Sequence, residues 1–189
     1  MYDMLQRLGF QSKWIRWVKG CFKSTSASIL INGSPITEFY LSRGLRQGDS
    51  LTSFLFFVVA EGLVWLVRQA LEENLLKGVK VGRNELECCM LQFIDDTLFM
   101  CKDSYNNVIT IKVILRCYEL ASGMKINFHK SKLAGINVER NSLECYVKSL
   151  NCTLTRLPFK YLRLVVGGSE RKKLFWEQIL NKINDRLSA

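Results

Sequence analysis

The stretch Phe93-Ile94-Asp95-Asp96-Thr97-Leu98-Phe99-Met100 sets two adjacent carboxylates inside an otherwise apolar, strand-like segment. Two ionised carboxylates in apolar surroundings repel each other and lose hydration energy, and a divalent cation removes both costs. Mg²⁺ binds one or two carboxylates together with substrate phosphates, so Asp95 and Asp96 are candidate metal ligands. The alternative is that Asp95-Asp96 is only the turn of a tight hairpin, where aspartate is common because it bonds to the backbone. The dipeptide by itself leaves both interpretations open.

A glycine-punctuated loop, Arg43-Gly44-Leu45-Arg46-Gln47-Gly48-Asp49, lies upstream and precedes a long predicted helix. Its two glycines let the backbone approach a ligand closely. Arg46 can contact a phosphate, and Gln47 can offer its amide to a base edge or a sugar. The N-terminus of the following helix adds a partial positive charge near any phosphate. An ordinary capped loop has the same composition, so the loop alone is a weak indicator of binding.

Helices and strands alternate in mixed order around these two segments. Hydrophobic periodicity and turn residues predict helices over about 12–22, 52–74, 104–121, 138–149 and 170–187. A hairpin is predicted over 28–39 with its turn at Asn32-Gly33, and a second has Val79-Lys80-Val81 as one strand and Cys88 to Met100 as the other. Shorter strands are predicted at 126–128, 153–157 and 161–166. This order predicts an α+β domain.

The composition favours a nucleic-acid partner. The 189 residues suit one domain or a large piece of one, and a hydrophobic share of 48% excludes a disordered tail. Lys and Arg number 27 against 17 Asp and Glu, which gives a net charge of +10. Such an excess favours nucleic acid first and an anionic membrane second, with a solvated surface as the plainer alternative.

The cysteines and the N-terminus indicate the compartment. Seven cysteines without a C-x-x-C pair, and a single histidine, argue against a tetrahedral zinc site and a secreted disulfide framework. The first residues do not resemble a signal peptide. The most apolar run, Phe54 to Val67, is too short for a bilayer and is interrupted by Glu61 and Gly62. We therefore expect a nuclear or cytoplasmic chain with reduced thiols and no membrane partner.

Four motifs in this order resemble the reverse transcriptase domain of plant LINE-type (non-LTR) retrotransposons. The loop Ser42 to Asp49 is similar to the family's template- and nucleotide-contacting loop, and Phe93-Ile94-Asp95-Asp96 looks like its catalytic box. Ser122-Gly123-Met124-Lys125-Ile126-Asn127, with Lys130-Ser131, is similar to the next palm motif. Leu157-Pro158-Phe159-Lys160-Tyr161-Leu162 resembles the segment that continues toward the thumb and holds the primer. The resemblance covers nearly the whole chain.

The resemblance implies an RNA-directed DNA polymerase, a nucleotidyltransferase that uses an RNA template, a DNA primer, a dNTP and two Mg²⁺ or Mn²⁺ ions. It makes Asp95 a catalytic metal ligand and Asp96 its partner or a second ligand. Arg46, Gln47 and Gly48 would line the template and nucleotide pocket. Lys125 would act near the departing pyrophosphate, with the lysines at 130 and 132 as close rivals.

The implied fold is a partial polymerase palm, a ferredoxin-like sheet with packed helices that lacks the first catalytic strand. Residues 1–168 would form this palm with the remaining fingers elements, and residues 169–189 would begin a thumb-like helical segment. The family's first catalytic aspartate would precede Met1, and Asp3, in a helical context, does not replace it. Two-metal chemistry usually needs that third carboxylate. We therefore expect little or no polymerase activity from this chain by itself.

Several residues depart from the family's pattern. Ser50 and Ser53 stand where prolines are usual, Arg163 where glycine is usual and Val165 where proline is usual. Ile94 stands where a small alanine is usual, and its bulk beside the carboxylates would crowd the incoming sugar. These departures keep two alternatives open: a nucleic-acid-binding module without catalysis, and a retrotransposon remnant without a function.

Overall fold

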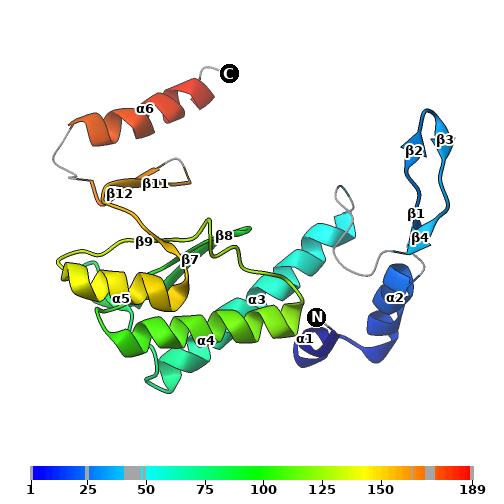
Figure 1. The fold of residues 1–189 in the computed structure, drawn as a ribbon, viewed down its shortest axis with the longest axis horizontal. Coiled ribbons are helices and arrows are strands. Elements are labelled where there is room, and N and C mark those ends of the chain that lie inside the picture. The colour runs from blue at the N-terminus through cyan, green and yellow to red at the C-terminus, as the bar shows by residue number, and fades with distance from the viewer. Residues whose placement is uncertain are drawn as a thin grey trace. The chain divides into compact units, whose positions relative to one another are not determined.

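A computed structural model describes residues 2–23, 26–40, 48, 50–162, 164–168 and 173–187 of the chain (Figure 1). Helices and short strands alternate along it, which confirms the α+β class. The chain divides into two compact units, Met1–Ile126 and Asn127–Ala189. The boundary expected between 168 and 169 falls inside the second of these units and stays a prediction.

The first unit is built on four helices: α1 (Tyr2–Arg7), α2 (Ser12–Lys23), α3 (Ser50–Glu72) and α4 (Tyr105–Ser122). Helix α1 contacts both α2 and α3, and α4 lies alongside α3 (Figure 1). The core between α1, α2 and α3 is a cluster of buried aliphatic side chains, Leu5, Ile15, Val18, Leu55 and Val58. Their spacing of three residues within α2 and within α3 puts each pair on one helix face. Apolar burial on that face therefore joins the three helices.

Helix α3 is longer than the apolar run from which we excluded a membrane span. Its segment Leu51–Glu72 contains a stretch of 18 residues with a mean hydropathy of 1.7, and it is long and apolar enough to cross a membrane by length and composition alone. The expectation concerned the run Phe54 to Val67 alone, and the folded helix extends this run at both ends; the core helix of a soluble protein can have the same length and composition. Its contacts with α1 and α4 cover part of this apolar surface, whereas Phe57 and Trp65 stay exposed.

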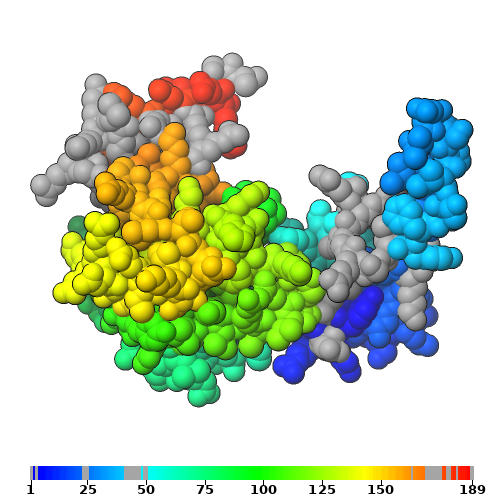
Figure 2. All heavy atoms as spheres, in the orientation of Figure 1, coloured from blue at the N-terminus to red at the C-terminus, as the bar shows by residue number. Residues whose placement is uncertain are grey.

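The hairpin predicted over 28–39 is confirmed. Strands β2 (Leu30–Ile31) and β3 (Ser34–Pro35) pair in antiparallel register around Asn32-Gly33, and β1 (Ser26–Ala27) pairs with β4 (Phe39–Tyr40) below them (Figure 1; the light blue atoms of Figure 2). Asn32 and Gly33 have φ angles of 51° and 83°. Both residues tolerate positive φ, which is why this dipeptide makes the turn.

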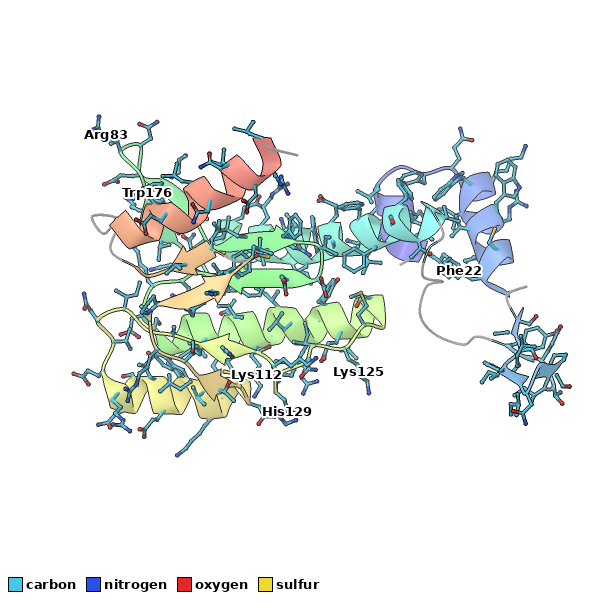
Figure 3. All side chains as sticks on the ribbon, turned by 90° about the horizontal axis from the view of Figure 1, so that it is seen from above. Phe22, Arg83, Lys112, Lys125, His129 and Trp176 are labelled. Atoms are coloured by element: carbon cyan, nitrogen blue, oxygen red, sulfur yellow. The ribbon has the colours of Figure 1, made fainter. Side chains whose placement is uncertain are left out.

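The second predicted hairpin is only partly right. Strand β5 (Val79–Val81) pairs with β6 (Leu86–Cys88), and Arg83 lies at the tip between them (Figure 3). The predicted single return strand over 88–100 is wrong, because the chain turns back at residues 94–95. Strands β7 (Met90–Phe93) and β8 (Asp96–Phe99) thus form a hairpin of their own. The turn residues Ile94 and Asp95 overlap the Asp95-Asp96 turn that the sequence left open as the alternative to a continuous strand.

A buried asparagine ties this strand region to α4. Asn107 is 4% exposed. Its Oδ1 accepts a hydrogen bond from the backbone N–H of Lys77 at 3.1 Å, and its Nδ2 donates to the carbonyl of Lys102 at 2.9 Å. The N–H of Lys102 donates in turn to the carbonyl of Lys77 at 3.0 Å. The buried amide thereby satisfies two backbone groups where the strands meet the helix.

Among its described residues, the second unit contains one parallel strand pair and one antiparallel strand pair. Strand β9 (Lys132–Leu133) pairs in parallel with β10 (Thr153–Leu154), and α5 (Arg140–Leu150) is the crossover between them. Strand β11 (Phe159–Tyr161) pairs with β12 (Leu164–Val166), which α6 (Lys173–Leu187) contacts. The predicted strand at 126–128 is wrong, because Phe128 begins a turn instead. Helices α5 and α6 agree with the predicted ranges.

The described strands make six two-stranded sheets and no single ferredoxin-like sheet. A ferredoxin-like sheet needs further strands beside the β7–β8 hairpin, and no other described strand pairs there. The helices and antiparallel hairpins are therefore those of an α+β fold, whereas the continuous sheet remains a prediction.

Candidate active site

The two adjacent aspartates lie at the closed end of the β7–β8 hairpin. Phe93 pairs with Asp96 across the two strands, so Ile94 and Asp95 form the turn and Asp96 is the first residue of β8. The hairpin-turn interpretation therefore holds for Asp95. It does not compete with the metal interpretation, because the same turn fixes the backbones of both aspartates within one short segment.

Both carboxylates are exposed, which corrects the expectation of an apolar setting. Burial does not destabilise them, so desolvation provides no reason for a cation to bind here. Two exposed carboxylates at a rigid turn still fit the donor set of Mg²⁺, which prefers oxygen ligands and keeps positions for water and phosphate. No group of three or more His, Cys, Asp or Glu side chains that could hold a metal ion occurs in the part of the chain that the structure describes, the β7–β8 turn included. The metal-ligand roles of Asp95 and Asp96 stay predictions.

The backbone of this turn is strained at Ile94. Its φ is 53°, in the left-handed region that β-branched residues avoid. The Ile94 side chain is 53% exposed, so little burial compensates for this conformation. Gln92 Nε2 donates to the Ile94 carbonyl at 3.4 Å. The residue that departs from the family's small alanine is thus also the conformationally costly one.

The glycine loop is described at one position only. Arg46 and Gln47 lie outside the described residues, so their predicted contacts with template and nucleotide stay predictions. Gly48 is exposed and has a φ of 89°, two residues before α3 begins at Ser50. An L side chain is strained at this φ, which gives a physical reason for glycine here.

Lys125 is exposed just beyond the C-terminal end of α4 (Figure 3). The helix ends at Gly123, whose φ of 76° is the left-handed cap expected from the sequence. Three residues after the cap, the N–H of Ile126 donates to Glu119 Oε1 at 2.8 Å. This bond holds the pKa of the Glu119 carboxyl below its ordinary value; partial burial opposes the shift and Arg116 reinforces it.

Sequence reasoning missed Glu119. A glutamate late in a helix gives no signal of a bond to an amide seven residues further on. The rival lysines at 130 and 132 are also exposed, but they belong to the second unit. Lys125 is therefore the one of the three that shares a unit with the β7–β8 hairpin.

The thiols offer no nucleophile near the hairpin. None of the seven cysteines forms a disulfide. Burial raises the pKa of the Cys89 thiol to about 11, and the nearby Cys101, Cys88 and Glu87 add to the shift. Burial also raises the pKa of Cys101, with Asp103 as a further cause. Both thiols are protonated at neutral pH, so a thiolate reaction at these positions is disfavoured.

Comparison with known proteins gives the family of the chain. The family model of the reverse transcriptase (RNA-dependent DNA polymerase) matches residues 2–165. An uncharacterized mitochondrial protein of Arabidopsis thaliana is 44% identical over 68 residues, which are 36% of this chain and 56% of that protein. A retrovirus-related Pol polyprotein from the type-1 retrotransposable element R2 of Popillia japonica is 27% identical over 128 residues, which are 67% of this chain and 17% of the polyprotein.

A third relative is the uncharacterized 149 kDa protein of transposon TX1 from Xenopus laevis. It is 25% identical over 130 residues, which are 67% of this chain and 9% of that protein. The chain therefore spans between 9% and 56% of the length of these relatives. The retrotransposon relatives agree with the resemblance carried by the four motifs. Because the family model extends from α1 into β12, well over half of the sequence, the chain belongs to the reverse transcriptase (RNA-dependent DNA polymerase) family.

Proposed function

We propose that this chain is the part of a non-LTR retrotransposon reverse transcriptase that presents Asp95 and Asp96 for RNA-directed DNA synthesis. The observation that carries the proposal is the β7–β8 hairpin, whose two-residue turn exposes both carboxylates at one end. Family membership and the retrotransposon Pol polyprotein among the relatives support it. The substrates would be an RNA template, a DNA primer and a dNTP.

The reaction joins the primer's 3′-oxygen to the α-phosphorus of the nucleotide and breaks the bond to pyrophosphate. Bound Mg²⁺ or Mn²⁺ supplies charge stabilisation for the attacking and leaving oxygens. Asp95 and Asp96 would hold such ions at the hairpin turn and orient them toward the triphosphate. Lys125 would place a positive charge near the departing pyrophosphate. Arg46 and Gln47 would contact template and nucleotide, and Gly48 would let the backbone come close.

A third carboxylate would come from a segment outside the described residues. The β7–β8 hairpin has no other described strand on its edges, so such a segment could add there as a further strand. This pairing would extend the hairpin toward the continuous palm sheet expected for residues 1–168, followed by the thumb-like helical segment. Because two carboxylates alone stabilise the ions poorly, we expect little or no polymerase activity from the chain by itself.

Calorimetric titration of the purified chain with Mg²⁺ or Mn²⁺ tests the proposal, with and without an RNA–DNA hybrid. We expect metal binding that requires the hybrid and is lost in Asp95→Asn. The matched control is Glu85→Gln, which removes an exposed carboxylate from the turn of the neighbouring β5–β6 hairpin. Glu85 is paired with Lys80, but an exposed pair contributes little stability. No metal binding with the hybrid present, or equal binding by Asp95→Asn, would overturn the proposal.

The net charge of +10 favours a second candidate, a nucleic-acid-binding module without catalysis. This function needs the basic surface but not the carboxylates. The same titration separates the two candidates. If the chain binds the hybrid but metal binding does not depend on Asp95, the result supports the non-catalytic module.

A further inference from the structure

The segment after α4 is bonded back onto the helix more extensively than a helix end requires. Gly123 in the left-handed conformation, with its N–H donating to the Glu119 carbonyl at 2.9 Å, is enough to stop a helix. Here two of the next three residues, Met124 and Ile126, are also hydrogen-bonded to the helix, although they have no regular secondary structure. These additional bonds come from side chains of the last turn of α4.

Glu119 provides the first of them. Its Oε1 accepts the N–H of Ile126 at 2.8 Å, and its Oε2 accepts a hydrogen bond from Arg116 Nη1 at 2.6 Å. The Glu119 side chain is 12% exposed, whereas Arg116 is 62% exposed. A partly buried carboxylate that uses both oxygens is a stronger link than an exposed ion pair, because charge-assisted bonds strengthen away from water.

Ser122 provides the second. Its hydroxyl donates to the Tyr118 carbonyl at 2.6 Å and accepts the N–H of Met124 at 3.1 Å. The Tyr118 hydroxyl in turn lies 3.7 Å from the Met124 sulfur. The amides of Met124 and Ile126 are therefore both bonded to side chains of α4. These two residues flank Lys125, so the Lys125 backbone is fixed on both sides while its side chain is exposed.

We propose that Glu119 and Ser122 are positioning residues that fix the backbone on both sides of Lys125 and so hold its ammonium ready for a phosphate group. The inference rests on the proposed function, since it takes a phosphate of the nucleotide or of the nucleic-acid backbone as the ligand. Holding the backbone reduces the entropy lost when a long lysine side chain meets that phosphate. The positioning bonds themselves do not depend on the ligand and can be tested without it.

Amide hydrogen exchange on the full chain tests the bonds. We expect the Ile126 amide to exchange roughly tenfold or more faster in Glu119→Ala, because a hydrogen bond to a charged group is lost. In Glu119→Gln the acceleration should be smaller, since the amide oxygen can still accept. Ser122→Ala should accelerate Met124 and serves as a second variant if Glu119→Ala does not fold. The control is Glu144→Gln, which removes the carboxylate of the exposed Arg140–Glu144 pair on α5. Unchanged Ile126 exchange in Glu119→Ala overturns the inference.

A double-mutant cycle tests the positioning of Lys125. In the wild-type chain, Lys125→Ala should lower the slope of log affinity for an RNA–DNA hybrid against log salt by about one. In Glu119→Ala, which removes the acceptor of the Ile126 N–H, the same substitution should lower it by clearly less. Binding of inorganic pyrophosphate is measured in parallel with the same variants. If Lys125→Ala weakens only pyrophosphate binding, the ligand of Lys125 is a nucleotide phosphate. If it weakens hybrid binding, the ligand is a phosphate of the nucleic-acid backbone.

The two proposals fail in different ways. An equal effect of Lys125→Ala in both backgrounds, or no effect on either ligand, overturns the positioning role. If Asp95→Asn still abolishes metal binding in that case, the proposed function stands. If the cycle shows coupling but metal binding is independent of Asp95, the proposed function fails and the positioning of a phosphate-binding lysine remains.

Discussion

Phe93 pairs with Asp96 across the β7–β8 hairpin, so a single two-residue turn sets the backbone positions of both aspartates. The first residue of that turn, Ile94, carries the strain, and the second, Asp95, carries the carboxylate. The strained residue and the candidate metal ligand are therefore neighbours in the chain. Changing the first residue tests the geometry without removing the ligand.

Ile94→Asn should stabilise the chain by about 1 kcal/mol, because asparagine adopts the left-handed conformation at lower cost than a β-branched residue. Urea unfolding of the two proteins measures the difference. Ile29→Asn is the matched control, since Ile29 is 55% exposed and Ile94 is 53% exposed, and only Ile94 has a positive φ. An equal change in both variants would show that lost apolar surface, and not backbone strain, determines the result.

Asn107→Ala should destabilise the chain by about 1–3 kcal/mol, because it leaves the Lys77 N–H and the Lys102 carbonyl without their buried partner. The neighbouring Asn106 is exposed, and Asn106→Ala should leave stability nearly unchanged. Urea midpoints compare the two variants. Similar midpoints would mean that water replaces the amide and that Asn107 does not join the strands to α4.

The stability contributed by Glu119 should depend on pH. Its folded-state pKa lies below the ordinary value, chiefly because of the Ile126 N–H bond. A depressed carboxyl pKa contributes stability that is fully present above the unfolded-state pKa and is lost as the pH falls through the folded-state pKa. Wild type should therefore exceed Glu119→Gln in stability at neutral pH, and the difference should shrink on acidification.

Unfolding of both proteins from neutral pH down to about pH 3 measures this difference. Glu144→Gln is the control and should give a smaller difference at neutral pH, since Glu144 is exposed and its ion pair with Arg140 along α5 contributes little stability. A difference between wild type and Glu119→Gln that is constant over the whole range would contradict an ionised carboxylate in the bond.

Binding of the chain to an RNA–DNA hybrid should weaken steeply as salt rises, because phosphate contacts by a chain of net charge +10 release counterions. Fluorescence anisotropy at a series of salt concentrations gives the slope. Asp95→Asn should not weaken binding in the absence of divalent metal, since it removes a negative charge. Undetectable binding at low salt would count against both candidate functions.

Local turn chemistry made much of the fold predictable. Asn32-Gly33 and Gly123 each have the left-handed conformation that their residue types favour, so the hairpin and the end of α4 follow from the sequence. The family assignment followed from four ordered motifs. For the hairpin turn and the helix end, the residues that cause the structure lie within a short segment of the sequence.

The predictions that failed depend on contacts between residues far apart in the sequence, or on a turn that the residue types do not favour. Asp95 and Asp96 indicated a turn as one alternative, but a β-branched residue is unfavourable at the positive φ of Ile94, so residue preference also allowed one continuous strand. The exposure of Asp95 and Asp96 depends on what packs around the hairpin, which no window of sequence contains. Glu119 acts on an amide seven residues away. The roles of Asp95, Asp96 and Lys125 in catalysis, and those of Arg46 and Gln47, stay predictions.

The strand pairs β7–β8 and β9–β10 differ in how much chain separates the two paired strands. The β7–β8 strands meet after a turn of two residues, whereas Lys132 meets Thr153 only after α5 has crossed between them. Closing a longer loop costs more chain entropy, and parallel pairs form slowly for that reason. We expect the turn that carries Asp95 to take shape early in folding and the parallel pair to form late.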